Sequence, residues 1–182
     1  MNELRLKDGR VVTVRRLGRG DRGKLQAFDR GLSERSRHYF PPHAYDDATV
    51  DKVIERNARG DDVIFVAEHA GEIVAYFFLW HAKLPVPTLG IGLTDRFQGA
   101  GLGRLAMETL IDAARGLGAH GIELTTALDN ERAFALYQKC GFEYVSDVEN
   151  ILGDGNMRIE RCMFLPLKEG AQPTGESHAP PV

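Results

Sequence analysis

The sequence has little cysteine, no long apolar run and no excess of positive charge. Its two cysteines, Cys140 and Cys162, stand alone, and neither belongs to a CxxC pair. This spacing argues against a zinc site and against a disulfide framework. Isolated cysteines fit a reducing compartment, so we expect a cytoplasmic protein without a bound metal. The first residues also lack the apolar stretch that is typical of a signal peptide.

The lack of a long apolar run and of excess positive charge limits which partners the protein can have. The longest apolar run, from Ile73 to Trp80, is far too short to cross a bilayer. The formal net charge is −3 at pH 7, so no overall positive field attracts nucleic acid or an anionic membrane. We therefore expect no nucleic-acid partner and no membrane partner, and any basic binding site has to be local.

The composition of the chain is that of a globular protein. It has 182 residues, of which 43% are hydrophobic and 27% are charged. That is enough for one domain with a hydrophobic core, and we expect this domain to occupy residues 1–167. The remaining segment, 168–182, is rich in proline, glycine and polar residues. We expect that segment to be a disordered tail.

The hydrophobic pattern changes its period along the chain. Helices are expected to begin after Asp21, Ser33 and Thr49, which are residue types that cap helix N-termini. The expected strands are Leu4–Leu6, Val11–Arg15, Val63–Glu68, Ile73–His81, Leu89–Leu93, Ile122–Ala127, Phe142–Val148 and Ile159–Leu165. The third and fourth should form a hairpin, whereas the strands on either side of the central helix should run parallel. The fold class is therefore a mixed α/β sheet with flanking helices.

A glycine-rich turn connects one of these strands to the central helix and reads Gln98-Gly99-Ala100-Gly101-Leu102-Gly103. The first N–H groups of a helix have no intrahelical partner, and the helix dipole favours negative charge there. Glycines also allow a phosphate to approach the backbone, because they lack a Cβ atom. Arg96 and Arg104 flank the turn with positive charge. The turn is therefore a candidate anion site.

The turn alone allows several interpretations. The mononucleotide P-loop pattern, GxxxxGK[ST], is absent. The dinucleotide pattern GxGxxG/A is matched by Gly101, Gly103 and Ala106, with Glu123 at a plausible distance downstream. An antiparallel hairpin precedes this match, however, and too few strand–helix units follow it for a doubly wound sheet. A glycine-rich turn that binds no ligand is the remaining alternative.

Two motifs together carry a resemblance to a known family. Gln98, Gly101 and Gly103 occupy the defining positions of the pattern Q/R-x-x-G-x-G/A, so Leu93–Gly103 resembles the acyl-CoA pyrophosphate loop of the GNAT superfamily of N-acyltransferases. Further along, Asn130–Phe142 resembles the second signature of that family, N-x-x-A-x-x-L/F-Y-x-K-x-G-F. Both motifs occur in order, with a helix and a strand between them.

The resemblance implies a GNAT fold, which is a twisted, mostly antiparallel mixed sheet flanked by helices. In that fold a bulged strand before the loop splays from the next strand, and Gly90 and Gly92 are compatible with a bulge or with close backbone approach. The resemblance also implies acetyl-CoA as the acyl donor, with no metal. The residues implied to bind it are Leu93, Gln98, Gly99, Ala100, Gly101, Leu102, Gly103, Arg104 and Asn130.

The activity implied by the resemblance is transfer of an acetyl group from acetyl-CoA to a primary amine, by direct attack in a ternary complex. Tyr137 matches the tyrosine that protonates or hydrogen-bonds the departing sulfur in this family. The backbone N–H of Leu93 is the implied polariser of the thioester carbonyl, and Asn130 is also a helix cap by its residue type. Family members are often dimers, so a homodimer is compatible with this sequence.

The nature of the acceptor is left open between two classes. Leu6–Arg10, Val12–Arg15 and Gly31–Ser36 look like the start of the GNAT domain in bacterial protein lysine acetyltransferases. The catalytic glutamate of those enzymes would align with Thr88, so the sequence departs from them at that point. The acceptor is therefore either a small-molecule amine or a protein lysine.

The sequence does not identify a general base. The strand Thr88–Thr94 contains no carboxylate, although many relatives carry a glutamate there. Asp95, His81, Glu68 and Glu123 lie on or beside neighbouring strands, and deprotonation through water is the other route. The missing carboxylate motivates an alternative function, a non-catalytic acyl-CoA-binding sensor or regulatory domain.

Overall fold

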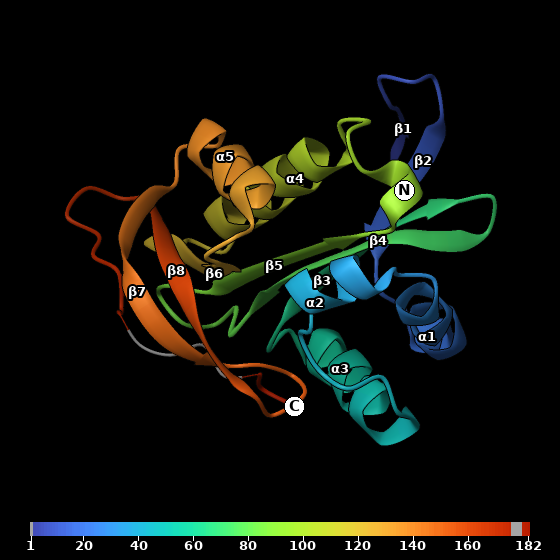
Figure 1. The fold of residues 1–182 in the computed structure, drawn as a ribbon, viewed down its shortest axis with the longest axis horizontal. Coiled ribbons are helices and arrows are strands. Elements are labelled where there is room, and N and C mark those ends of the chain that lie inside the picture. Colours follow the sequence, from blue (N-terminus) through green and yellow to red (C-terminus); the bar gives the residue numbers. More distant parts are fainter. Residues whose placement is uncertain (1, 176–179) are drawn as a thin grey trace.

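The structure, a computed structural model, describes residues 2–175 and 180–182 and contains one eight-stranded sheet (Figure 1). The spatial order of the strands is β1-β2-β3-β4-β5-β6-β8-β7. Their bounds are β1 (Asn2–Arg5), β2 (Val11–Arg16), β3 (Val63–His69), β4 (Glu72–Trp80), β5 (Thr88–Leu93), β6 (Gly121–Ala127), β7 (Glu143–Ile151) and β8 (Met157–Pro166). Neighbouring strands run antiparallel, apart from β5 and β6, which are parallel. The mixed, mostly antiparallel sheet expected from the sequence is confirmed.

Helices cover both faces of the sheet. On one face lie α1 (Arg22–Arg30), α2 (Glu34–Tyr39) and α3 (Asp47–Arg59), and on the other lie α4 (Leu102–Gly116) and α5 (Glu131–Lys139) (Figure 1). We call these the α1–α3 face and the α4–α5 face. In the part of the chain that the structure describes, no helix is long and apolar enough to cross a membrane.

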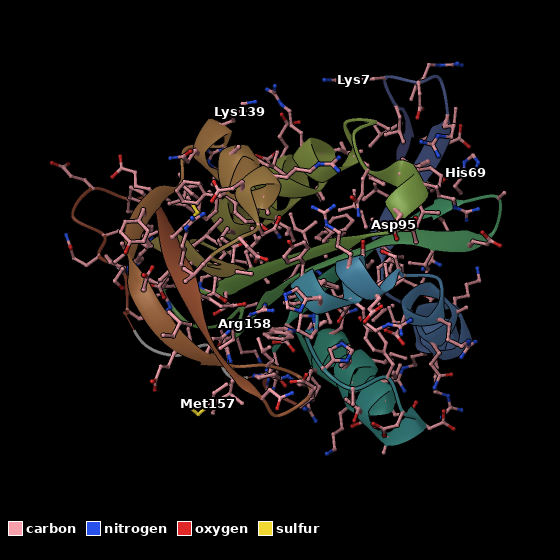
Figure 2. The ribbon with its side chains drawn as sticks, in the orientation of Figure 1. Lys7, His69, Asp95, Lys139, Met157 and Arg158 are labelled. Atoms are coloured by element: carbon pink, nitrogen blue, oxygen red, sulfur yellow. The ribbon has the colours of Figure 1, made fainter. Side chains whose placement is uncertain are left out.

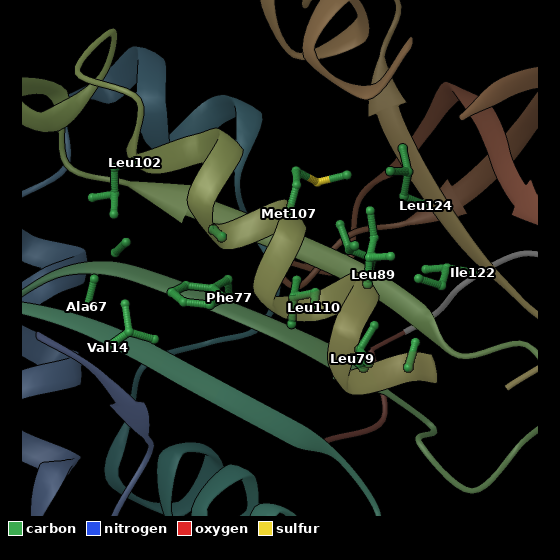
Figure 3. Close-up of a cluster of buried hydrophobic side chains, with 14 of the residues drawn as sticks. Val14, Ala67, Phe77, Leu79, Leu89, Leu102, Met107, Leu110, Ile122 and Leu124 are labelled. Atoms are coloured by element: carbon green, nitrogen blue, oxygen red, sulfur yellow. The ribbon is translucent and has the colours of Figure 1, made fainter. Parts of the chain in front are cut away.

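Strand β4 is apolar along nearly its whole length because both of its faces are buried. Its residues alternate between two hydrophobic clusters, as successive side chains of a strand do. Phe77 and Leu79 belong to the cluster beneath α4 (Figure 3). Tyr76 and Phe78 belong to the cluster beneath α1 and α3. The sheet is therefore the middle layer of a three-layer domain.

Local signals set most of the helix boundaries. Ser33 caps α2 by accepting from the N–H of Ser36, and Asn130 caps α5 by accepting from the N–H of Ala133. The prediction that Thr49 caps the third helix is wrong. The cap is Asp46, whose carboxylate accepts from both the N–H and the hydroxyl of Thr49, so α3 begins before Thr49. Asp46 and Thr49 are both residue types that cap helices, and the carboxylate of Asp46 offers two acceptor oxygens.

The two parallel strands diverge almost at once, because β5 and β6 are paired only at Thr88 and Glu123. The splay expected before the glycine-rich loop is therefore present. The expected bulge is not, since β5 pairs with β4 from Thr88 to Leu93 without a register shift. The two glycines serve close approach instead. A Cβ atom at Gly90 would lie 2.2 Å from the ring of Phe78, and one at Gly92 would lie 2.2 Å from the ring of Phe40.

Part of the segment 168–182 lies against the domain. The hydroxyl of Thr174 donates to Glu123 at 2.6 Å, and Val182 packs beside the cluster under α1 and α3. Residues 176–179 lie outside the described part of the chain. Both the domain boundary after residue 167 and the disorder of the tail stay predictions.

Two leucines, one within α4 and one at its end, differ in burial and allow the packing under this helix to be tested by substitution. Leu110 is fully buried between α4 and the sheet, whereas Leu117 at the end of that helix is 48% exposed. Leu110→Ala should lower the free energy of unfolding by about 2–5 kcal/mol through lost burial and a residual cavity. Leu117→Ala should change it by less than about 0.5 kcal/mol. Urea denaturation of both variants checks this, and similar losses would contradict the assigned burial.

Candidate active site

The glycine-rich loop presents a row of unused backbone donors. Gly99 and Gly101 have φ values of 82° and 93°, which favour glycine. The N–H of Gln98 donates to Asp95 and the N–H of Leu105 donates to Gly101. Among the described residues, the N–H groups from Gly99 to Arg104 donate no backbone hydrogen bond. They belong to the loop and the first turn of α4, so they form an anion cradle.

The positive charge beside this loop differs from the charge that the sequence indicated. Arg104 lies along α4 in an ion pair with Glu108, and Arg96 pairs with Glu72. Lys7, in the turn between β1 and β2, reaches the loop instead, and its N–H donates to Ala100 at 3.1 Å (Figure 2). A Cβ atom at Gly101 would lie 3.4 Å from Cγ of Lys7. No local motif marks Lys7, because the contact depends on the fold.

Gln98 joins the loop to helices on both faces of the sheet. Its amide nitrogen donates to the hydroxyl of Ser36 at the start of α2, at 3.0 Å. Its amide oxygen accepts from Arg132 in α5, at 3.1 Å. Asp95 accepts from the hydroxyl of Ser33 at 2.7 Å and from that of Ser36 at 2.9 Å. These bonds fix the position of the loop relative to α2.

The backbone of β5 offers polar groups to the gap that opens toward β6. The N–H of Thr94 donates to Val74 on the β4 side, and the carbonyl of Pro87 accepts from Glu123 on the β6 side. Because N–H and C=O groups alternate sides along a strand, those of Ile91 and Leu93 point toward β6. The strand β6 no longer pairs with them there. The Leu93 N–H is therefore directed into the gap.

Tyr137 lies on α5, above the same part of the sheet. Its ring is buried in the cluster under α4 and packs on Phe142, with 6.2 Å between ring centroids. Burial raises the pKa of Tyr137 well above its ordinary value, and the charges of Glu160 and Cys140 add to the effect. The phenol therefore stays protonated at neutral pH, which suits a hydrogen-bond or proton donor.

An open cavity of about 80 Å³ lies where β5 and β6 diverge. Its walls come from the end of α2, the apolar face of β4 and the start of β5. Thr125 of β6 and the β7–β8 hairpin complete it, and Pro180 lies at its edge. Figure 2 shows Arg158 of that hairpin facing the α1–α3 side of the molecule. The cavity and the α4–α5 helices thus lie on opposite faces of the sheet.

The four side chains considered as bases are engaged elsewhere. Glu68 is paired with Arg15 and Lys24, and Asp95 holds the two serines before α2. Glu123 is fully buried and accepts from Thr174. His81 follows β4 with φ at 54°, and it does not line the cavity.

The carboxylate that does line the cavity is Glu160 of β8, which sequence reasoning missed. Its Oε2 accepts from Asn150 at 2.9 Å and its Oε1 accepts from Arg158. Alternation along the expected strand predicts the side of the sheet on which Glu160 lies, but it does not predict which residues of other strands surround it. Within the described ranges, no group of three or more His, Cys, Asp or Glu side chains is arranged to hold a metal ion.

Comparison with known proteins identifies the family. The family model described as "Acetyltransferase (GNAT) family" matches residues 29–142, which is more than half of the chain. The chain therefore belongs to the GNAT acetyltransferase family, and the resemblance found in its motifs is confirmed.

Relatives by sequence are similar over shorter stretches. The chain is 35% identical over 81 residues to the uncharacterized N-acetyltransferase YdgE of Bacillus subtilis, which covers 42% of this chain and 52% of that protein. It is 44% identical over 55 residues to the N-alpha-acetyltransferase RimI of Mycobacterium tuberculosis, covering 30% of this chain and 33% of that protein. The matches thus span about half or less of these relatives' lengths.

Solved structures share the fold over nearly the whole chain. The GNAT domain of S. lividans PAT superposes with a TM-score of 0.76 at 20% identity, covering 91% of this chain and 96% of that domain. Mycobacterium smegmatis RimJ in complex with CoA-disulfide gives a TM-score of 0.76 at 20% identity, covering 94% and 88%. The GNAT fold expected from the motifs is therefore confirmed.

The bonds around Asp95 predict a pH-dependent contribution to stability. Partial burial alone would raise the pKa of Asp95, but hydrogen bonds from Ser33 and Ser36 outweigh it and lower the pKa. A carboxylate with a lowered folded pKa stabilises the fold above its unfolded pKa of ~3.9, and the effect is lost as pH falls through the folded pKa. Asp95→Asn should cost about 1 kcal/mol at pH 7 and less near pH 3.5.

Urea denaturation at the two pH values measures this difference between wild type and variant. Asp112→Asn is the control, because that carboxylate is exposed and faces Arg115 at 3.4 Å. It should change stability by less than about 0.5 kcal/mol. An Asp95→Asn loss of the same size at both pH values would show that the carboxylate's charge contributes nothing.

Proposed function

We propose that this protein transfers an acetyl group from acetyl-CoA to a primary amine, of a small molecule or a protein lysine, by direct attack in a ternary complex. The observation that carries the proposal is the gap between β5 and β6. It begins after the Thr88–Glu123 pair, where the cavity on the α1–α3 face lies, and extends along β5 toward the anion cradle at the start of α4. A donor bound at the loop can thus reach an acceptor in the cavity through the sheet.

The residues present fit the acyl donor along its length. The free N–H groups from Gly99 to Arg104 suit a pyrophosphate, with the Lys7 ammonium beside them. The backbone groups of Ile91 and Leu93 suit the amides of a pantetheine arm, which would pair with β5 as a strand does. Gln98 and Asn130 support this site by holding the loop and the start of α5.

Acetyl-CoA would supply a thioester, which is an activated acyl group. The amine nitrogen, as free base, bonds to the carbonyl carbon while the carbon–sulfur bond breaks. The Leu93 N–H would stabilise the oxyanion, and the Tyr137 hydroxyl would protonate or hydrogen-bond the departing thiolate. The nitrogen gives up one proton and the thiolate takes one up, so the free amine and the thioester yield the amide and the thiol. The one proton released overall is the proton that an ammonium group loses before its nitrogen attacks.

The cysteines favour direct transfer over an acyl-enzyme. Burial raises the pKa of the Cys162 thiol to about 11, and it also raises the pKa of Cys140. Since the thiolate is the nucleophilic form, neither side chain is activated at neutral pH. Both pack beside the sheet and α5 as small apolar groups.

Calorimetric titration of the purified protein with acetyl-CoA, and separately with NADH, tests the donor. We expect acetyl-CoA to bind and NADH not to bind. Thiol release with a panel of primary amines then tests turnover. Acetyl-CoA binding without thiol release would favour the alternative, a non-catalytic acyl-CoA-binding domain, and NADH binding alone would overturn both.

Tyr137→Phe tests the chemical step. Removing the hydroxyl should lower kcat by about 100-fold or more, because a positioned proton donor is lost. The affinity for acetyl-CoA should be unchanged, since the ring still packs on Phe142. Tyr144→Phe, on an exposed position of β7, is the matched control and should leave both quantities unchanged. Unchanged kcat in Tyr137→Phe would remove this residue from the mechanism.

A further inference from the structure

The floor of the cavity is polar and comes from strands that meet only in the folded chain. Arg158 and Glu160 share one face of β8, and Asn150 of β7 lies opposite Arg158. Thr125 of β6 faces the same side, because its partner on β8 is Cys162, two residues from Glu160. All four line the cavity at the point where β5 and β6 diverge.

The hydrogen bonds fix the orientation of the Asn150 amide. Its Nδ2 donates to Oε2 of Glu160 at 2.9 Å and to the hydroxyl of Thr125 at 3.1 Å. An ionised carboxylate only accepts, so the amide nitrogen has to face Glu160. The other end of the amide, Oδ1, therefore points away from both partners.

This amide oxygen is left without a partner. Asn150 is 7% exposed, and within the described residues its Oδ1 accepts no hydrogen bond. A buried acceptor without a donor costs free energy, so such groups need an explanation. A donor supplied by a ligand in this cavity would remove that cost.

The remaining polar groups determine the sign of the ligand's charge. All three guanidinium nitrogens of Arg158 are engaged: Nε and Nη2 donate to Glu160, and Nη1 donates to the carbonyl of His38. No cation of the floor is left for a carboxylate or a phosphate. An N–H donor fits the floor, whereas a second acceptor facing Oδ1 and Glu160 would be repelled.

The walls above this floor are apolar and aromatic. Phe78 and Trp80 of β4 stack with 4.2 Å between ring centroids, and Phe40 lies 6.1 Å from Phe78. Gly90 makes room for the Phe78 ring. Aromatic faces attract ammonium groups and pack on hydrocarbon.

From these contacts we propose that Asn150 and Glu160 form the binding site for the ammonium group of the acceptor. The acceptor class is then a primary amine with one positive charge on an apolar stem. The proposal rests on the proposed acetyl transfer, because that reaction brings an amine to this cavity. Glu160 also lies close enough to affect Tyr137, whose pKa its charge raises.

The same contacts disfavour two other kinds of amine. A polyamine carries further positive charges, but Glu160 is the only lining carboxylate within the described chain, so a second ammonium group would have no carboxylate to pair with. A free α-amino acid brings a carboxylate, which would find Arg158 engaged. A lysine side chain within a peptide satisfies both conditions, since its stem is alkyl and its backbone is uncharged.

Calorimetry with the CoA-bound protein tests the site without requiring turnover. The probes are phenethylamine, 3-phenylpropionate (the same stem with an anionic head) and spermidine. The variant is Asn150→Ala. The matched control is Asn156→Ala in the turn of the same hairpin, where the side chain bonds to Asp154 and lies outside the cavity lining. We expect phenethylamine to bind more tightly than the other two probes. Its Kd should rise about tenfold in Asn150→Ala and stay unchanged in Asn156→Ala.

Acetyl-CoA affinity and a melting curve establish that each variant is folded. Should Asn150→Ala fail to fold, Glu160→Gln replaces it, because it keeps an acceptor for Asn150 and removes the charge. It should also weaken phenethylamine binding about tenfold. Equal Kd values in wild type and the folded variant would overturn the site, and so would equal binding of 3-phenylpropionate or no amine binding at all.

The outcome separates this inference from the proposed function. Amine binding that depends on Asn150, without any thiol release, would retain the site and reject acetyl transfer. Thiol release with KM for phenethylamine unchanged in Asn150→Ala would retain acetyl transfer and reject the site.

Discussion

Strands β5 and β6 pair at Thr88 and Glu123 and then separate, and the site depends on that separation. Beyond the pair, the backbone groups of Ile91 and the N–H of Leu93 face a gap that β6 does not fill, whereas the Leu93 carbonyl accepts from the Gln98 amide at 3.5 Å. Backbone groups without partners inside a protein are costly, so such a gap suits an extended ligand that carries amides. Close packing keeps the adjoining wall in place, because Gly90 and Gly92 let the rings of Phe78 and Phe40 lie directly against β5.

Hydrogen bonds connect the loop at the end of β5 to the helix that supplies one wall of the cavity. Gln98 bonds to Ser36, and Asp95 bonds to Ser33 and Ser36, so the start of α2 is fixed to the loop. The end of this short helix supplies Tyr39 and the following Phe40 to the cavity. The position of the glycine-rich loop and the shape of the cavity are thus set by the same few hydrogen bonds. The side chain of Gln98 thus bonds to neighbours in both α2 and α5.

Sequence reasoning succeeded where structure is set by nearby residues. The glycine-rich loop, the Asn130 cap and the alternating strands all depend on local backbone preferences, and so they could be predicted. It failed where residues compete locally, as Asp46 did with Thr49, or where distant strands meet. Lys7 reaches the loop through the first hairpin, and Asn150 and Glu160 reach the cavity through β7 and β8. No spacing within the chain encodes those contacts, because they depend on the order of strands in the sheet.

The absence of a carboxylate on β5 then has a physical consequence for the acceptor. An alkyl ammonium has a pKa near ~10, so its nitrogen must lose a proton before it attacks. Glu160 is held by Arg158 and Asn150, which suits it to holding the ammonium in place more than to removing its proton. The cavity is open to solvent, and water can therefore carry the proton away without a dedicated base. In the proposed acetyl transfer, the fraction of free amine, which increases with pH, would then limit the reaction. The sheet would contribute position and an oxyanion donor, and α5 would contribute the Tyr137 hydroxyl.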